Sequence, residues 1–344
     1  MASIYDIAKI AGVSAMTVSN VLNNKGRFSD KTRDRVLRIA AEQGYELNVN
    51  ARSLRERRTY TVGIITPNVS NDYFSTIVLE MEKALHNRGY SSFICNTAYD
   101  GSRCESYLTE LRRRNVDGIA VVGTPSLQTG ELIGNIPCTF VDYYGPLRTT
   151  NCCLIASDLL ALTADQLACL ESHGCSSTAL IVPIAHESDY LDAVRSSFTA
   201  KLAEHSLREH PYSCLNDPAL TLLVSNDMYA SPKDFVATIK QALAKQPQIN
   251  GIATIGDRMA MLVCDAVKEM GRTPGNDILI IGSDNSIYSS VHTPNISTVD
   301  RNRHLMARAA TGALLAMMEG KEPAERSITI PHRIIERETT LGAN

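Results

Sequence analysis

The sequence predicts an α/β protein in which an N-terminal all-α head of three short helices precedes two doubly wound parallel sheets. A change of pattern along the chain carries this prediction. Helical periodicity over residues 1–45 gives way to apolar runs that alternate with amphipathic stretches. The chain has 344 residues, of which 44% are apolar and 21% charged, which is ordinary for a globular protein of about two domains.

Turn and cap residues bound the three expected helices. The first, IYDIAKIAG, places apolar residues at helical spacing and stops at Gly12. Ser14 is expected to cap the second, SAMTVSNVL. Ser29 is expected to cap the third, DKTRDRVLRIAAEQ, which stops at Gly44.

The first two of these helices meet the steric requirements of a helix-turn-helix. Ala8 is small where the helices cross, and Gly12 falls in the turn, where a positive φ suits glycine. Apolar residues fill the interhelical positions Ile7, Ala11, Val13, Val18 and Val21. The pattern indicates a DNA-binding head whose second helix enters the major groove.

Charge is distributed unevenly along the chain. The whole chain has 34 Lys+Arg against 37 Asp+Glu, a formal net charge of -3. Residues 1–58 contain eleven Lys/Arg and six Asp/Glu, hence +5, and the remainder has 23 and 31, hence -8. A basic head on an acidic body is expected of a small nucleic-acid module joined to a larger domain with another role.

The body contains eight apolar runs that we expect to be strands. They cover residues 60–66, 91–95, 116–123, 137–144, 177–182, 221–225, 250–256 and 277–282. Each precedes a helical or polar segment, as in βαβ units with parallel sheets, and their number fits two sheets better than one.

Several classes of protein and site are not indicated. The nine cysteines are odd in number and form no C-x-x-C pair, and the histidines show no Cys/His grouping with metal-ligand spacing, so neither a metal nor a cofactor is expected. No apolar run is long enough to span a membrane. Asp6 and Lys9 interrupt the start of the chain where a signal peptide is apolar, so a cytoplasmic protein is expected.

Runs along nearly the whole chain resemble the lactose-repressor (LacI) family of transcription regulators. In the head these are IYDIAKIAGVSAMTVSNVLN, RFSDKTRDRVLRIAAEQGY and NVNARSLRERRT, and in the body VGIITPNVSNDYF, VDGIAVVG, GDRMAMLVCDAVKEMG and DILIIGSDN. The resemblance implies a head at 1–47, a hinge helix at 48–58 and a body at 59–344 similar to periplasmic sugar-binding proteins. We expect an N-subdomain at 60–157 plus 287–319, and a C-subdomain at 158–286 plus 320–344.

Residues near the start of the second helix are the candidates for reading DNA. Ala15, Met16 and Asn20 are expected to face base edges, and Asn20 can make a bidentate contact to adenine. Short polar side chains suited to phosphates are Ser14, Thr17, Ser19, Asn23, Ser29 and Thr32.

The hinge segment is too short and too basic to form a stable helix alone, so we expect it to become helical only on DNA. The resemblance makes Leu54 a wedge that enters the minor groove, flanked by Ala51, Arg52 and Arg55.

A small ligand is expected between the subdomains, because ligands of open α/β sheets lie beyond the carboxyl ends of the strands. Polar and aromatic residues at those ends suggest a carbohydrate-like ligand. The candidates are Asn71, Tyr73, Phe74, Asp142, Arg195, Asp257 and Asp284. Asp72 and Asp257 also begin helices and are expected to cap them.

Two positions depart from the family pattern. In AVRSSF, Val194 stands where the family has arginine and Ser197 where it has glycine, and Arg195 is shifted by one. Gly256-Asp257 replaces the Asn-Asp of many sugar binders, whereas Asp142 and Asp284 match the family.

The expected partners are a pseudo-palindromic DNA operator, a sugar-like effector and a second copy of the chain. One head makes few contacts, and the C-terminal tail lacks the heptad helix of tetrameric family members, so a homodimer is favoured. The alternatives are an enzyme, a solute-binding protein, and a sequence-tolerant DNA binder. The chain contains none of G-x-G-x-x-G, G-x-x-x-x-G-K-[ST] and G-x-S-x-G.

Overall fold

The computed structural model describes residues 3–22, 26–45, 58–123, 129–143, 149–184, 221–225 and 231–342. Residues Met1–Thr59 and Tyr60–Asn344 form two separate compact units, here called the head and the body. Among the described residues, no helix is both long and apolar enough to cross a bilayer.

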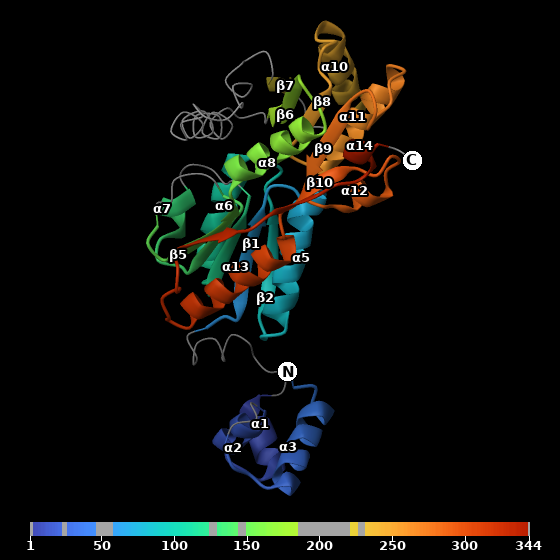
Figure 1. The fold of residues 1–344 in the computed structure, drawn as a ribbon. Helices are drawn as coiled ribbons and strands as arrows, with labels where there is room; N and C mark the ends of the chain where they lie inside the picture. Colours follow the sequence, from blue (N-terminus) through green and yellow to red (C-terminus); the bar gives the residue numbers. More distant parts are fainter. Residues whose placement is uncertain are drawn as a thin grey trace. The chain divides into compact units, whose positions relative to one another are not determined.

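The head consists of the three expected helices, α1 (Ile4–Ala11), α2 (Ala15–Leu22) and α3 (Asp30–Glu42) (Figure 1). Gly12 ends α1 with a φ of 62°, and Ser14 Oγ accepts a hydrogen bond from Thr17 N at 3.1 Å. Ser29 caps α3 by accepting from Thr32 N. The predicted stops and caps are therefore confirmed, and α1 also carries a capping box between Ser3 and Asp6.

A small apolar core holds the three head helices together. Ile7, Val18 and Val36, one from each helix, have no exposed surface. They pack with Ala8, Ala11, Val21, Ile39 and Ala40. The predicted interhelical positions are thus the buried ones, except Val13, which is half-buried against the same core.

The first sheet of the body has the strand order β11-β5-β4-β3-β1-β2, with every neighbouring pair parallel. Its strands are β1 (Thr61–Thr66), β2 (Ser91–Asn96), β3 (Gly118–Val122), β4 (Cys138–Val141), β5 (Cys152–Ser157) and β11 (Ser327–Ile330). Helices α5 (Asp72–His86) and α13 (Arg303–Met318) cover one face, and α6 (Gly101–Arg113) and α7 (Thr129–Ile133) the other. Ile64 and Ile65 illustrate this burial on both sides, because they belong to the cores of opposite faces.

The second sheet has the order β12-β10-β9-β8-β6-β7 and is parallel except for β12. Its strands are β6 (Thr178–Ile184), β7 (Thr221–Ser225), β8 (Gly251–Thr254), β9 (Leu279–Ser283), β10 (Ser297–Asp300) and β12 (Arg333–Ile335). Helices α10 (Pro232–Lys245) and α11 (Asp257–Glu269) pack on one face, and α8 (Leu159–Ser172) on the other. Two short helices, α12 (Ile287–Val291) and α14 (Glu338–Leu341), follow β9 and β12.

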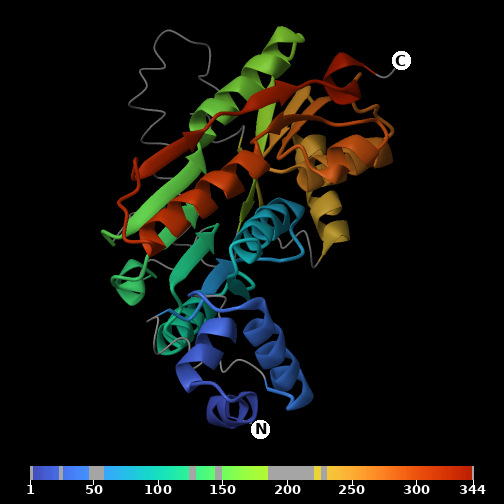
Figure 2. The ribbon, with the colours of Figure 1, turned by 90° about the horizontal axis from the view of Figure 1, so that it is seen from below.

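The chain passes between the two sheets three times: after β5, between β10 and α13, and between β11 and β12. Figure 2 shows the red C-terminal segment running from one sheet to the other. The expected subdomain boundaries need correction here. Strand β10 belongs to the second sheet although 287–319 was expected in the N-subdomain, and β11 belongs to the first although 320–344 was expected in the C-subdomain.

Each of the eight expected apolar runs contains a strand, but four further strands were not predicted: β5, β10, β11 and β12. Three of them are only three or four residues long, and β11 and β12 are edge strands with exposed or half-exposed positions. Such segments lack the continuous apolar run that marks a strand buried on both faces.

Candidate functional site

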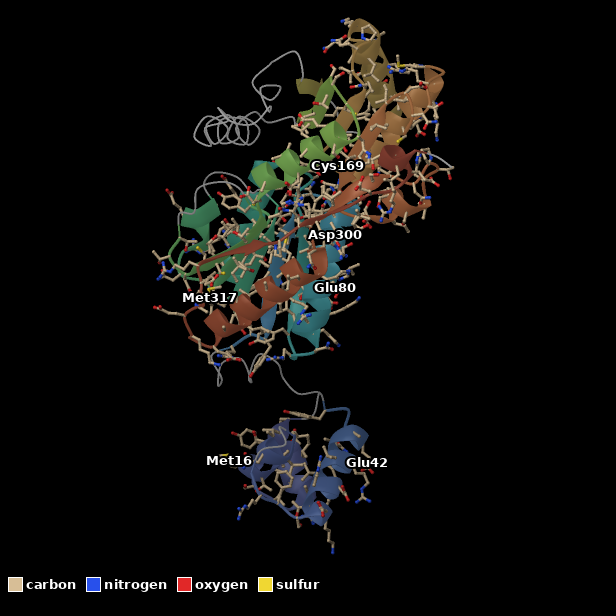
Figure 3. All side chains as sticks on the ribbon, in the orientation of Figure 1. Met16, Glu42, Glu80, Cys169, Asp300 and Met317 are labelled. Atoms are coloured by element: carbon tan, nitrogen blue, oxygen red, sulfur yellow. The ribbon has the colours of Figure 1, made fainter. Side chains whose placement is uncertain are left out.

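The base-reading candidates on α2 differ in exposure. The Met16 side chain is 70% exposed, and Figure 3 shows it at the edge of the head. Ala15 is half-buried against the head core, and Asn20 is half-exposed. A Cβ built on Gly26 would lie 3.6 Å from Asn20 Nδ2, so the Asn20 amide lies close to the chain after α2.

The hydroxyls proposed for phosphate contact form two matching pairs at helix starts. Ser14 Oγ and Thr17 Oγ1 lie 2.9 Å apart at the start of α2, and Ser29 Oγ and Thr32 Oγ1 also lie 2.9 Å apart at the start of α3. In each pair the serine accepts a backbone N–H. Each pair therefore caps its helix and sits at an N-terminus, where the helix dipole favours an anion. Ser19 lies half-exposed on α2.

Part of the predicted DNA and ligand site falls on residues outside the described ranges. These are Asn23, the hinge residues Ala51, Arg52, Leu54 and Arg55, and Arg195. Their roles stay predictions from the sequence.

In the body, the aromatic candidates lie where α5 begins, just beyond the end of β1. The side chain of Asn71 accepts a hydrogen bond from Tyr73 N at 2.9 Å and so caps α5. The Tyr73 ring is 3% exposed and meets Phe74 edge-on at 5.4 Å. Asn71, and not Asp72 as expected, is thus the cap, and the Asp72 carboxylate instead pairs with Arg303 at 2.8 Å.

Arg301 connects the acidic candidates at the ends of the two sheets. Asp142 directly follows β4 of the first sheet, Asp284 directly follows β9 of the second, and Arg301 follows β10. One terminal nitrogen of Arg301 bonds to Asp142 Oδ1, and the other lies 3.5 Å from Asp284 Oδ1. All three residues are less than 10% exposed. The guanidinium therefore bridges carboxylates from both subdomains.

The Tyr73 ring completes this cluster. The Arg301 guanidinium carbon lies 4.4 Å from the ring centroid, within the range of a cation–π contact. Burial raises the pKa of Asp284 well above its usual range, although Arg301 opposes this, and burial also raises the pKa of Tyr73. Asp142 and Asp284 adopt positive φ values of 57° and 104°. Strained backbone at two sheet ends is typical of functional positions.

Asp257 is held differently from the other ligand candidates. It is 1% exposed, and its two oxygens accept from Thr298 Oγ1 at 2.5 Å and Ser286 N at 2.6 Å. A Cβ on Gly282 would lie 2.4 Å from Asp257 Oδ1, so only glycine leaves room for this carboxylate. The expectation that Asp257 caps α11 is wrong, because its side chain joins α11 to β10 and α12. Burial raises its pKa to about 6.

Two buried hydroxyls lie near these strand ends. Thr66 Oγ1, at the end of β1, and Ser286 Oγ, after β9, make no hydrogen bond with any described residue. A buried hydroxyl without a partner is costly, so such groups commonly face a water or a ligand.

Sequence reasoning missed Arg301 and Arg303, because both precede or begin a helix at a passage between the sheets that was not predicted. Arg303 bonds to Asp72, Thr76 and Asn285 O, and so ties α5 to the segment after β9. Sequence reasoning also overlooked one Cys/His pair at a spacing of four residues. Cys169 lies on α8, and His173, four residues later, directly follows the end of that helix at Ser172.

Family models match three parts of the chain. "Bacterial regulatory proteins, lacI family" matches residues 3–48, "Periplasmic binding proteins and sugar binding domain of LacI family" matches 59–138, and "Periplasmic binding protein-like domain" matches 167–340.

Relatives and solved structures match over nearly the full length. The HTH-type transcriptional regulator RegA of Clostridium saccharobutylicum is 28% identical, covering 98% of this chain and 99% of its own. The ribose operon repressor of Halalkalibacterium halodurans is 28% identical, covering 99% and 98%. The lac repressor dimer bound to operator and an anti-inducer has the same fold, with a TM-score of 0.82 at 21% identity over 99% of both chains.

Proposed function

The chain belongs to the LacI family of bacterial regulatory proteins, and on this basis we propose a function for each of its two units, the head and the body. The protein is a DNA-binding transcription regulator. We propose that it acts as a repressor, with the head reading an operator and the body binding a small effector that changes operator affinity. The curated relatives are transcription regulators and repressors, whereas the alternative of a solute-binding or enzymatic protein has no support among them.

The head supports the DNA-binding half of the proposal. Met16 is exposed on α2, and the half-exposed Asn20 has an amide that can be aimed at a base edge. The hydroxyl pairs at the starts of α2 and α3 offer donors beside positive helix ends, which suits phosphates. Exposed basic residues on α3 add a charge attraction; these are Lys31, Arg33, Arg35 and Arg38.

A homodimer fits this reading mode. A single small head makes few base contacts, and two heads related by a twofold axis read two half-sites of a pseudo-palindrome. The hinge prediction, with Leu54 entering the minor groove between Arg52 and Arg55, belongs to the same proposal.

The observation that carries the effector half is the bridge from Arg301 to Asp142 and Asp284. It lies beyond the carboxyl ends of strands in both sheets, which is where open α/β sheets bind ligands. Carboxylates and a guanidinium together can accept from and donate to a ligand rich in hydroxyls, while the Tyr73 ring can pack on its apolar face. The unpartnered hydroxyls of Thr66 and Ser286 offer two more contacts.

We propose a carbohydrate or a carbohydrate derivative as the effector. Among the relatives are repressors of ribose and sucrose operons, and one solved neighbour is a regulator in complex with cellobiose. The ligand changes operator affinity only if it binds two arrangements of the subdomains unequally. Because Arg301 joins both subdomains, a ligand that takes over its carboxylate partners would bind those arrangements with different strength.

A thermal-shift screen of sugars, sugar phosphates and purines on the full-length protein tests the effector half. A ligand at 100 times its Kd stabilises the native state by about 2.7 kcal/mol. The hit should lose its effect in Asp284→Asn but keep it in Glu269→Gln, a change in an exposed ion pair with Lys240. A hit that stabilises both variants equally would place the ligand elsewhere.

A further inference from the structure

Three metal-ligating side chains from two segments meet on the second subdomain, and none of them belongs to the proposed effector site. Cys169 lies on α8, His173 directly follows the end of that helix at Ser172, and Glu336 directly follows β12. Their ligating atoms all lie within 4.8 Å of one another. Cys169 Sγ is 3.8 Å from Glu336 Oε2, and His173 Nε2 bonds to the same oxygen. Figure 3 labels Cys169 on α8.

The spacing of these atoms is close to that of a tetrahedral zinc site. Zn–S, Zn–N and Zn–O bonds of about 2.0–2.3 Å place the ligand atoms roughly 3.3–3.6 Å apart. Cys169 Sγ and Glu336 Oε2 are already near that separation. Small side-chain rotations would lengthen the distance between His173 Nε2 and Glu336 Oε2 to the same value. The side chains of His173 and Glu336 are 29% and 38% exposed, which leaves the fourth position to water.

Both segments are held in place before any metal binds. Leu167 and Leu170 anchor α8 in the apolar core, and the Gln166 amide donates to Thr254 O and Gly282 O at 3.0 and 2.7 Å. On the other side, the neighbouring Arg337 donates to Ile296 O at 2.8 Å. A site whose supports are rigid loses little entropy on binding a metal.

The cluster does not resemble a nucleophilic cysteine site. In such sites a base faces the thiol and lowers its pKa. Here the Cys169 thiol donates to Glu336 Oε2 at 3.8 Å, and burial together with Glu336 raises the thiol pKa to about 12. A bound cation would take the place of the thiol proton, as metal binding does.

We propose that Cys169, His173 and Glu336 form a binding site for a divalent metal of the Zn²⁺ class. Mixed sulfur, imidazole and carboxylate ligands suit a borderline-soft cation rather than Mg²⁺ or Ca²⁺, which prefer oxygen alone. The bound ion joins α8 to the segment after β12. Helix α8 and strand β12 each follow a point where the chain crosses from the first sheet to the second. A bound ion would therefore link two of the three crossings.

Titration of the chelator-treated full-length protein with Co²⁺ tests this site. We expect one equivalent to bind with a thiolate-to-cobalt charge-transfer absorption that Zn²⁺ displaces. Cys169→Ser should abolish that absorption. His173→Gln and Glu336→Gln should weaken binding by about 100-fold or more, exceeding the roughly 10–100-fold cost of losing a supporting residue.

The matched control is a neighbouring pair on the same two segments, in which Asp165 lies four residues before Cys169 and His332 four residues before Glu336. His332 Nε2 lies 2.8 Å from Asp165 Oδ2, and the double variant Asp165→Asn/His332→Gln should bind Co²⁺ as the wild type does. Circular dichroism establishes that each variant is folded, and Glu336→Gln preserves the shape of its side chain. Absence of the absorption in the wild type, or its persistence in Cys169→Ser, would overturn the proposal.

Discussion

Arg301 and Asp142 form a buried ion pair between two parts of the body that are far apart in sequence. Asp142 directly follows a strand of the first sheet, and Arg301 directly follows a strand of the second. Their side chains are 6% and 8% exposed, so the pair is largely shielded from water. The pair, extended to Asp284, links the subdomains at the place where the effector is proposed to bind.

Replacing Arg301 by methionine should destabilise the body. The buried Asp142 and Asp284 side chains would lose the guanidinium that bridges them, and breaking a buried pair typically costs about 3–5 kcal/mol. Denaturant unfolding of the full-length protein measures the loss. The matched control is Arg333→Met, whose ion pair with Asp300 leaves the arginine side chain 75% exposed and should cost less than about 1 kcal/mol. Equal losses in both variants would contradict a buried role for Arg301.

The Ser29→Asp variant distinguishes the role of Ser29 as a helix cap from its proposed contact with a DNA phosphate. Aspartate is as good an N-cap as serine, so head stability should change by less than about 0.5 kcal/mol. DNA affinity should fall, because a carboxylate then faces phosphate. Gln43→Asp, an exposed change at the other end of α3, alters the head charge equally. If both variants bind DNA alike, Ser29 is a cap alone.

Asn20→Ala should relax the sequence preference of the head more than Met16→Ala does. The Asn20 amide can place two hydrogen bonds on adenine, worth about 1–3 kcal/mol of discrimination, whereas Met16 offers apolar contact. Titrations against a set of base-substituted operators measure this preference. An undiminished preference in Asn20→Ala would show that another residue reads the site.

Asp257 should make the stability of the body pH-dependent. Its pKa rises from 3.8 to about 6 on folding, so between these values the native state holds a proton that the unfolded chain releases. Stability from this group therefore falls as pH rises from about 4 to 6, by about 3 kcal/mol at 1.36 kcal/mol per unit.

Unfolding curves of the wild type and Asp257→Asn across that range test this directly. The difference in unfolding free energy between the two should change by up to about 3 kcal/mol in favour of the wild type at low pH. Glu110 forms an exposed ion pair with Arg114, so the unfolding free energy of Glu110→Gln should change with pH as that of the wild type does. A pH-independent difference between the wild type and Asp257→Asn would mean that Asp257 keeps an ordinary pKa.

The head could be predicted from the sequence almost residue by residue. Its helices are short and local, and caps such as Ser29 and turns such as Gly12 act on neighbours a few residues away. The main strands of the body were also predictable, because parallel strands buried on both faces are continuous apolar runs.

The passages of the chain between the two sheets could not be predicted in the same way. Strands β10 and β11 are short, and which sheet each joins depends on long-range pairing with β9 and β5. Sequence reasoning therefore did not single out Arg301, although it contacts both Asp142 and Asp284, which the sequence named as ligand candidates. Cys169 and His173 were at a recognisable spacing, but their partner Glu336 is 163 residues from His173.

The most direct test of the account is the ratio of operator to random-DNA affinity for the full-length protein. A site is selected from a random duplex pool, and fluorescence anisotropy then compares it with a scrambled duplex at one fixed salt concentration. A family regulator should select a pseudo-palindrome and prefer it by about 10³-fold or more. A ratio near one, with binding that depends on salt alone, would contradict the account.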